Sequence, residues 1–164
     1  MELIASYTAT GTVASIDFTS IAADWTDLCI KISTRSAATG GPDWIDITLN
    51  GDSAITYYSN KWILGSGSTV TSSGNNREVS LWEPSSYTAN TFSNAEIYIP
   101  NYLSSNQKSY SSDSVIENNA TASYMSLIAG KWATTSAITS IGIVPRSTTF
   151  TQYSSAYLYG VKNA

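Results

Sequence analysis

Short runs in which apolar and polar residues alternate recur along the whole chain, separated by clusters of Gly, Asn, Asp and Ser. In the segment 28–35, Leu28, Ile30 and Ile32 alternate with polar residues, and Arg35 is placed on the polar side. This period of two predicts β-strands. The predicted strands are 3–8, 13–18, 27–36, 44–49, 56–64, 77–82, 95–100, 108–117, 123–131, 138–144 and 156–161.

Turn-forming residues separate these runs. The segment 38–42 contains Gly-Gly-Pro and predicts a strong break, and Asn50-Gly51-Asp52 predicts a hairpin connection. Pro100 ends its strand because proline cannot donate to a ladder. The Gly/Ser/Thr/Asn-rich segment 65–76 is predicted to be an exposed loop, and no segment has a convincing helical pattern.

About ten short strands at spacings of roughly 8–15 residues favour one antiparallel β-sandwich domain over residues 1–164. A jelly roll is the preferred topology. Strand count alone does not separate it from an immunoglobulin-like sandwich or a closed barrel. The chain has no internal repeat of fixed period, which disfavours a propeller or a solenoid.

Composition makes the predicted surface neutral and rich in hydroxyl groups. Charged residues make up 12% of the chain, while Ser and Thr number 28 and 20. Disordered chains are also Ser-rich, but they lack the aromatic and β-branched residues that are frequent here. The net charge of −4 and the scattered Lys and Arg residues argue against nucleic acid as a partner.

The chain contains no histidine, which removes Ser–His and Cys–His catalysis and most zinc sites. The lone Cys29 lies in an apolar run and is predicted to be a buried small hydrophobe. We therefore expect no enzyme and no cofactor. No segment resembles an export signal or a membrane-spanning helix, so we expect neither export by a visible signal nor membrane association.

Paired carboxylates are the one catalytic pattern to weigh, because glycoside hydrolysis needs two. Asp43 and Asp46 are three residues apart and point to opposite faces of a strand. Asp113 and Glu117 share a face but lie about 13 Å apart. Neither pair predicts a catalytic site.

A weak calcium site is a second candidate, formed by Asp43, Asp46, Asn50 and Asp52 around one turn. Their spacing matches no calcium-loop signature. Turn formation explains Asn50 and Asp52 equally well.

Aromatic residues can form a sugar-stacking platform, fill the core or line a subunit interface, and core or interface is the preferred interpretation. The glycan or interface candidates are Trp44, Tyr57, Tyr58, Trp62 and Trp82, taken from a larger group that includes Trp25, Trp132, Tyr87, Tyr98, Tyr102 and Tyr110. Leu3 and Ile4 are candidate contacts to a capsid or another subunit, because the first predicted strand can pair with an open sheet edge.

Several segments resemble recurring segments of small structural proteins of tailed bacteriophages, common in aquatic and cyanobacterial phages. In the second half they are 88–102, 108–113, 117–120, 138–141 and 152–161. Near the N-terminus they are 16–21, 25–28 and 49–53. The resemblance spans nearly the whole chain and carries over no active site.

The resemblance implies a jelly-roll protein of the virion exterior, assembled in the host cytoplasm. The first hypothesis is a capsid decoration (cement) protein, a homotrimer that binds the major capsid protein or other virion proteins and bridges and stabilises capsomers. The second is a tail or fibre component that binds host surface glycan. The third is a free carbohydrate-binding module or glycosidase.

Overall fold

The computed structural model describes residues 1–117, 123–146 and 148–162, which form twelve β-strands and one 3₁₀ turn at Ile55–Tyr57. None of these residues belongs to a helix long and apolar enough to cross a membrane. The strands are β1 (Glu2–Thr8), β2 (Ile16–Phe18), β3 (Asp27–Thr34), β4 (Asp43–Leu49), β5 (Tyr58–Ser66), β6 (Thr69–Ser73), β7 (Glu78–Trp82), β8 (Ser93–Ile99), β9 (Lys108–Glu117), β10 (Ser123–Trp132), β11 (Ile141–Pro145) and β12 (Ser155–Val161).

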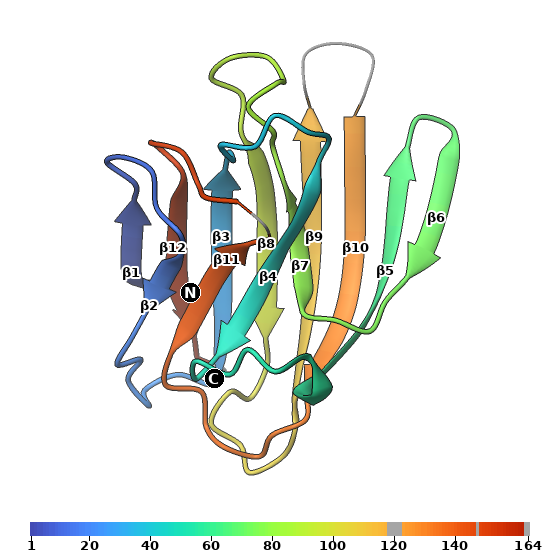
Figure 1. The fold of residues 1–164 in the computed structure, drawn as a ribbon. Helices are drawn as coiled ribbons and strands as arrows, with labels where there is room; N and C mark the ends of the chain where they lie inside the picture. Colours follow the sequence, from blue (N-terminus) through green and yellow to red (C-terminus); the bar gives the residue numbers. More distant parts are fainter. Residues whose placement is uncertain (118–122, 147, 163–164) are drawn as a thin grey trace.

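The strands form two antiparallel sheets that pack as a sandwich, as predicted (Figure 1). The large sheet has eight strands in the order β1-β12-β3-β8-β9-β10-β5-β6. The small sheet has four strands in the order β2-β11-β4-β7. Both sheets have two free edges, so the closed-barrel alternative is wrong for the described residues.

The connections follow a jelly-roll path. The chain crosses between the sheets at every connection except the hairpins β5–β6, β8–β9 and β9–β10. The small sheet places its first strand beside its last, followed by its second and third, which is the strand order of one jelly-roll sheet. The three antiparallel strands β8, β9 and β10 stand where the other sheet of a simple jelly roll has one strand.

The inner faces of the two sheets share one hydrophobic core. Leu28, Ile30 and Ile32 are buried, as the alternation in this segment predicts. The prediction for Arg35 is wrong, because this residue lies just beyond the end of β3 and is buried. Its guanidinium group turns inward and binds backbone carbonyls of the connection between β7 and β8.

Cys29 is buried, as predicted. Burial raises the pKa of its thiol to about 11, and the nearby Glu96 carboxylate adds to the effect. The thiol therefore stays protonated at neutral pH, which makes it a poor nucleophile.

Two turn predictions need correction. The predicted loop 65–76 contains β6, which follows β5 through a two-residue turn where Gly67 adopts φ +56°. The Asn50-Gly51 turn forms, with φ values of +54° and +73°, but it does not make a hairpin between neighbouring strands. The strand that follows, β5, belongs to the other sheet.

Three strands begin two or three residues later than the sequence pattern predicts. Residues 13–15 make only an isolated bridge, from Val13 to Phe150, and β2 begins at Ile16. Ile138 is buried, but its amide donates to Tyr102 outside any ladder, and β11 begins at Ile141. In both cases apolar residues enter the core from a connecting segment. The predicted strand 56–64 instead begins at Tyr58, after the 3₁₀ turn.

Gly130, near the centre of the large sheet, cannot be replaced by a residue with a side chain unless its neighbour moves. It pairs with Tyr110 on the neighbouring strand, and the Tyr110 ring covers the position of the missing side chain. A Cβ atom at Gly130 would lie 2.2 Å from the Tyr110 Cζ atom. Burial raises the pKa of the Tyr110 hydroxyl above its ordinary range, so this ring remains neutral.

Candidate interaction surface

The outer face of the large sheet is open to solvent over β9, β10, β5 and β6. Alternate residues of β9 are exposed, and the register places them beside exposed residues of β10. Leu127 of β10 lies between Asp113 of β9 and Ile63 of β5. Met125 lies beside Val115 in the same way.

Five apolar side chains gather on this face and expose 37–70% of their surface. We call them the apolar strip: Ile63, Val70, Val115, Met125 and Leu127. The ladder register makes them neighbours on four consecutive strands. Scattered exposed hydrophobic residues are ordinary, whereas large contiguous apolar groups are often found at interaction surfaces.

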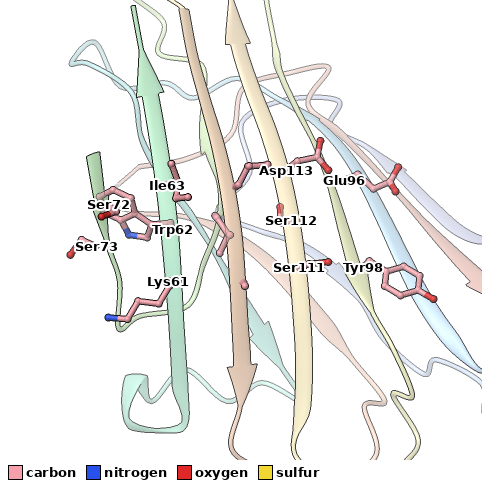
Figure 2. Close-up of a pocket in the computed structure, with 13 residues that line it drawn as sticks. Lys61, Trp62, Ile63, Ser72, Ser73, Glu96, Tyr98, Ser111, Ser112 and Asp113 are labelled. Carbon is pink, nitrogen blue, oxygen red and sulfur yellow. The ribbon is translucent and has the colours of Figure 1, made fainter. Parts of the chain in front are cut away.

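A groove of about 770 Å³ borders the apolar strip on the same face, and Figure 2 shows the residues that line it. We call it the outer groove. Ile63 and Leu127 form its apolar part, while Glu96, Tyr98 and Asp113 form its polar part. Three strands of the meander and the β5–β6 hairpin supply the lining, so the register of five strands determines its shape.

Two carboxylates stand side by side in the polar part. Glu96 of β8 pairs directly with Asp113 of β9, and Figure 2 shows both side chains on this face. Like charges directly opposite are unfavourable in a sheet. Lys31 of β3 offsets this repulsion with its Nζ atom 3.0 Å from Glu96 Oε2, and the hydrogen bond to Glu96 raises the pKa of Lys31.

Tyr98 is held in a defined position at the polar end of the groove. Its hydroxyl donates to Asp27 Oδ2 at 2.5 Å, and Asp27 Oδ1 accepts from the backbone N–H of Asn101 at 2.8 Å. The bond to the Asp27 carboxylate, aided by burial, raises the pKa of Tyr98 to about 12. The hydroxyl therefore stays protonated at neutral pH, and its hydrogen bond holds the ring in place.

The five preferred aromatic candidates do not form one platform. Tyr58 and Trp82 are buried in the core. Trp44 and Trp62 are half-buried and pack on each other, with ring centroids 4.9 Å apart, so they join β4 to β5. Tyr57 is exposed in the 3₁₀ turn. Core packing thus accounts for most of this set.

Leu3 and Ile4 lie on β1, an edge strand of the large sheet. Leu3 is exposed, and Ile4 is half-buried where the ladder between β1 and β12 shifts its register. No described strand pairs with the outer edge of β1, and the predicted contact through these residues stays a prediction.

Side-chain oxygens of the four calcium candidates accept hydrogen bonds from N–H groups of the protein. Asp46 binds Arg146 Nη2 at 2.5 Å, and Asp43 Oδ1 accepts from the Trp44 N–H. The Asn50 and Asp52 side-chain oxygens accept from Thr139 and Trp132, respectively. No group of three or more His, Cys, Asp or Glu residues in the described part of the chain is placed to hold a metal ion.

Asp46 belongs to a charge cluster in which it and Glu78 are buried, while Arg77 and Arg146 are partly exposed. Burial raises the pKa of Asp46, and the hydrogen bond and charge of Arg146 oppose this shift. Asn60 of β5 donates to the Glu78 carboxylate at 2.7 Å. The cluster thus ties the large sheet to β7, the edge strand of the small sheet.

Asp113 and Glu117 share the outer face of β9, as the sequence predicts. The nearer carboxylate is Glu96, which sequence analysis did not pair with Asp113. The two residues are 17 positions apart, and only the register of β8 on β9 brings them together. The sequence pattern from which this pairing could have been predicted is the alternation of exposed residues in the two adjacent hairpins β8–β9 and β9–β10.

Comparison with known proteins identified no relative of this chain. No protein-family model matches the sequence, and no curated protein matches it.

Proposed function

We propose that this chain is a structural protein of a bacteriophage particle, a capsid decoration protein that docks on other virion proteins. The observation that carries the proposal is the apolar strip on the open face of the large sheet. The resemblance of the sequence to small virion proteins of tailed phages supports the setting. A surface low in charge also suits a protein that is packed among many copies.

The docking surface supplies its affinity by removing the apolar strip from water. Burying apolar surface contributes about 25 cal/mol per Å². One copy with such a small strip binds modestly, but many copies on a shell resist expansion together. The protein would sit on the exterior of the particle and bridge neighbouring capsomers.

Replacing Ile63 and Leu127 together by Ser is expected to reduce occupancy on the particle. Each half-exposed side chain contributes about 1 kcal/mol when a partner covers it, so the pair weakens binding roughly thirtyfold. The measurement is the copy number of the variant on purified capsids that lack the wild-type protein. A reconstruction of wild-type particles should show hundreds of copies on the shell.

Ile55→Ser provides the matched control, because Ile55 is 55% exposed and Ile63 is 50% exposed. Ile55 lies in the 3₁₀ turn and outside the apolar strip. Its substitution should leave occupancy unchanged. Equal occupancy for all three proteins, or a handful of copies at the tail, would contradict the proposal.

A second candidate function is glycan binding by a tail or fibre component. The polar part of the outer groove favours it, because the fixed Tyr98 ring lies beside the Glu96 and Asp113 carboxylates. A sugar ring can stack on the aromatic face while its hydroxyls donate to the carboxylates.

Tyr98→Ala is expected to weaken binding to oligosaccharides from the host envelope by about tenfold, or ~1.4 kcal/mol. Tyr98→Phe keeps the ring and should retain most of the affinity. Titration calorimetry with both variants checks this. Failure of the wild-type protein to bind any of these oligosaccharides would remove this candidate.

A further inference from the structure

In the described part of the chain, three of the four sheet edges carry features that disfavour backbone pairing with another chain along the whole edge. β1 begins with the charged Glu2 and has a register shift around Ile4. β2 is only three residues long and contains the exposed Asp17. β7 is buried, and side chains of the large sheet bind its backbone: Ser112 donates to the Val79 carbonyl, and Asn60 donates to the Glu78 carbonyl. Such features are known to keep an edge strand from pairing with another chain.

The fourth edge, β6, has none of these features. All five of its residues are exposed, and none is charged or proline. It pairs with β5 on one side only and forms the last strand of the sheet (Figure 1). The unprotected edge stands out because the same fold protects the other three.

We propose that β6 pairs with β6 of a second copy of this chain, antiparallel, with Thr71 on the two-fold axis. The two large sheets then join into one continuous sheet. The contact is isologous, because each copy contributes the same strand to it.

The register follows from the hydrogen-bond pattern of the β5–β6 hairpin. Ser66 and Thr69 close the two-residue turn as a pair, and Thr71 pairs with Leu64. In an antiparallel ladder the peptide groups of alternate residues point to opposite sides. Those of Val70 and Ser72 therefore point away from β5. Placing Val70 opposite Ser72 of the second copy makes about four backbone hydrogen bonds.

Side chains and charge suit this symmetric pairing. Thr71 meets its own copy, and Thr–Thr pairs across antiparallel strands are favourable. The chain carries a net charge of −4, but between residues 58 and 76 its one charged side chain is that of Lys61. Two copies thus approach through a segment of low charge, where mutual repulsion is small.

The pairing also extends the apolar strip. Val70 lies on the outer face opposite Gly65 and beside Ile63, so the strips of two copies flank the axis. One short strand buries much less than the roughly 800 Å² per partner of a stable interface. The association is therefore weak and depends on concentration. It does not require the virion function proposed above.

Cysteine substitution at the axis tests the register. In a non-hydrogen-bonded antiparallel pair the Cα atoms are about 4.5 Å apart, within the range of a disulfide. Thr71→Cys is expected to give mostly covalent dimer on mild oxidation. Ser72→Cys, the matched control, lies too far from its own copy and should cross-link at least about tenfold less. Cys29 is buried and does not compete. Equal cross-linking of both variants would overturn the proposal.

Sedimentation of the wild-type chain and two Val70 variants tests the edge itself. Val70→Pro removes an N–H that points away from β5, so the hairpin keeps its own hydrogen bonds while the edge is blocked. Val70→Thr keeps the N–H and the shape. We expect the wild-type chain and Val70→Thr to dimerise as concentration rises, and Val70→Pro to associate at least about tenfold more weakly. A wild-type chain that remains monomeric, or a trimer unaffected by Val70→Pro, would contradict the pairing. Virion occupancy tests the proposed function separately.

Discussion

Replacing Arg35 by Met is expected to lower the free energy of unfolding by about 3–5 kcal/mol. Only 8% of Arg35 is exposed, and its guanidinium donates at 2.8–3.0 Å to the carbonyl oxygens of Ser85, Tyr87, Thr88 and Thr91. Met fills similar space but removes the guanidinium donor from these acceptors. Each buried carbonyl that is left without a donor costs about 1–3 kcal/mol, while the Thr88 carbonyl still accepts from Thr91. Urea denaturation at neutral pH measures the effect.

Lys31→Met is the control for Arg35→Met, because it also replaces a cation by Met but at an exposed position on β3. Lys31 and Glu96 are about half exposed, so water screens their ion pair and its loss should cost far less than the loss of Arg35. Equal losses for the two substitutions would show that the buried hydrogen bonds of Arg35 are not responsible.

The cost of Arg35→Met is also expected to shrink at acidic pH. Burial raises the pKa of Glu83 above its ordinary value, while the Thr91 hydrogen bond and the Arg35 charge oppose the shift. Without Arg35 the folded-state pKa rises further. Above that value, ionised Glu83 destabilises the variant, and the penalty disappears as pH falls below the unfolded-state value. Urea midpoints of both proteins between pH 7 and about 4 show how the destabilisation by Arg35→Met changes with pH. A destabilisation that grows toward low pH would contradict this prediction.

Trp132→Ala is expected to destabilise the fold by about 3–5 kcal/mol, because it leaves a cavity where the sandwich has one of its largest buried side chains. Trp132 is 2% exposed, and its Nε1–H donates to Asp52 Oδ2 at 2.9 Å. The change removes both the packing and the link between the end of β10 and the turn after β4. The unfolding midpoint should fall by roughly 6–20 °C in calorimetry.

Tyr57→Ala is the comparison for Trp132, because Tyr57 is exposed and lies close in the structure, its carbonyl accepting from the Ala133 N–H. It should cost within about 1 kcal/mol. Trp132→Phe is expected to fall between the two variants. A small effect of Trp132→Ala would mean that this aromatic residue serves a surface, as in the alternative interpretation of the aromatic residues.

Alternation of apolar and polar residues was sufficient to predict most strands of this protein. The predicted 108–117 coincides with β9, and 123–131 differs from β10 by one residue. Long strands with one buried face are predictable because the period of two reflects burial directly. β6 was missed because both of its faces are exposed, so burial leaves no period in its sequence.

The sequence alone therefore determined the class of this protein: an antiparallel sandwich, neutral and hydroxyl-rich on its surface, with a buried cysteine. These properties depend on composition and on neighbours two residues apart along the chain. Only the tertiary structure decided that Arg35 turns inward and that Glu96 pairs with Asp113. It also decided that the apolar strip lies on the outer face of the large sheet and extends to the open β6 edge. Such features depend on register between strands distant in sequence, which local alternation does not specify.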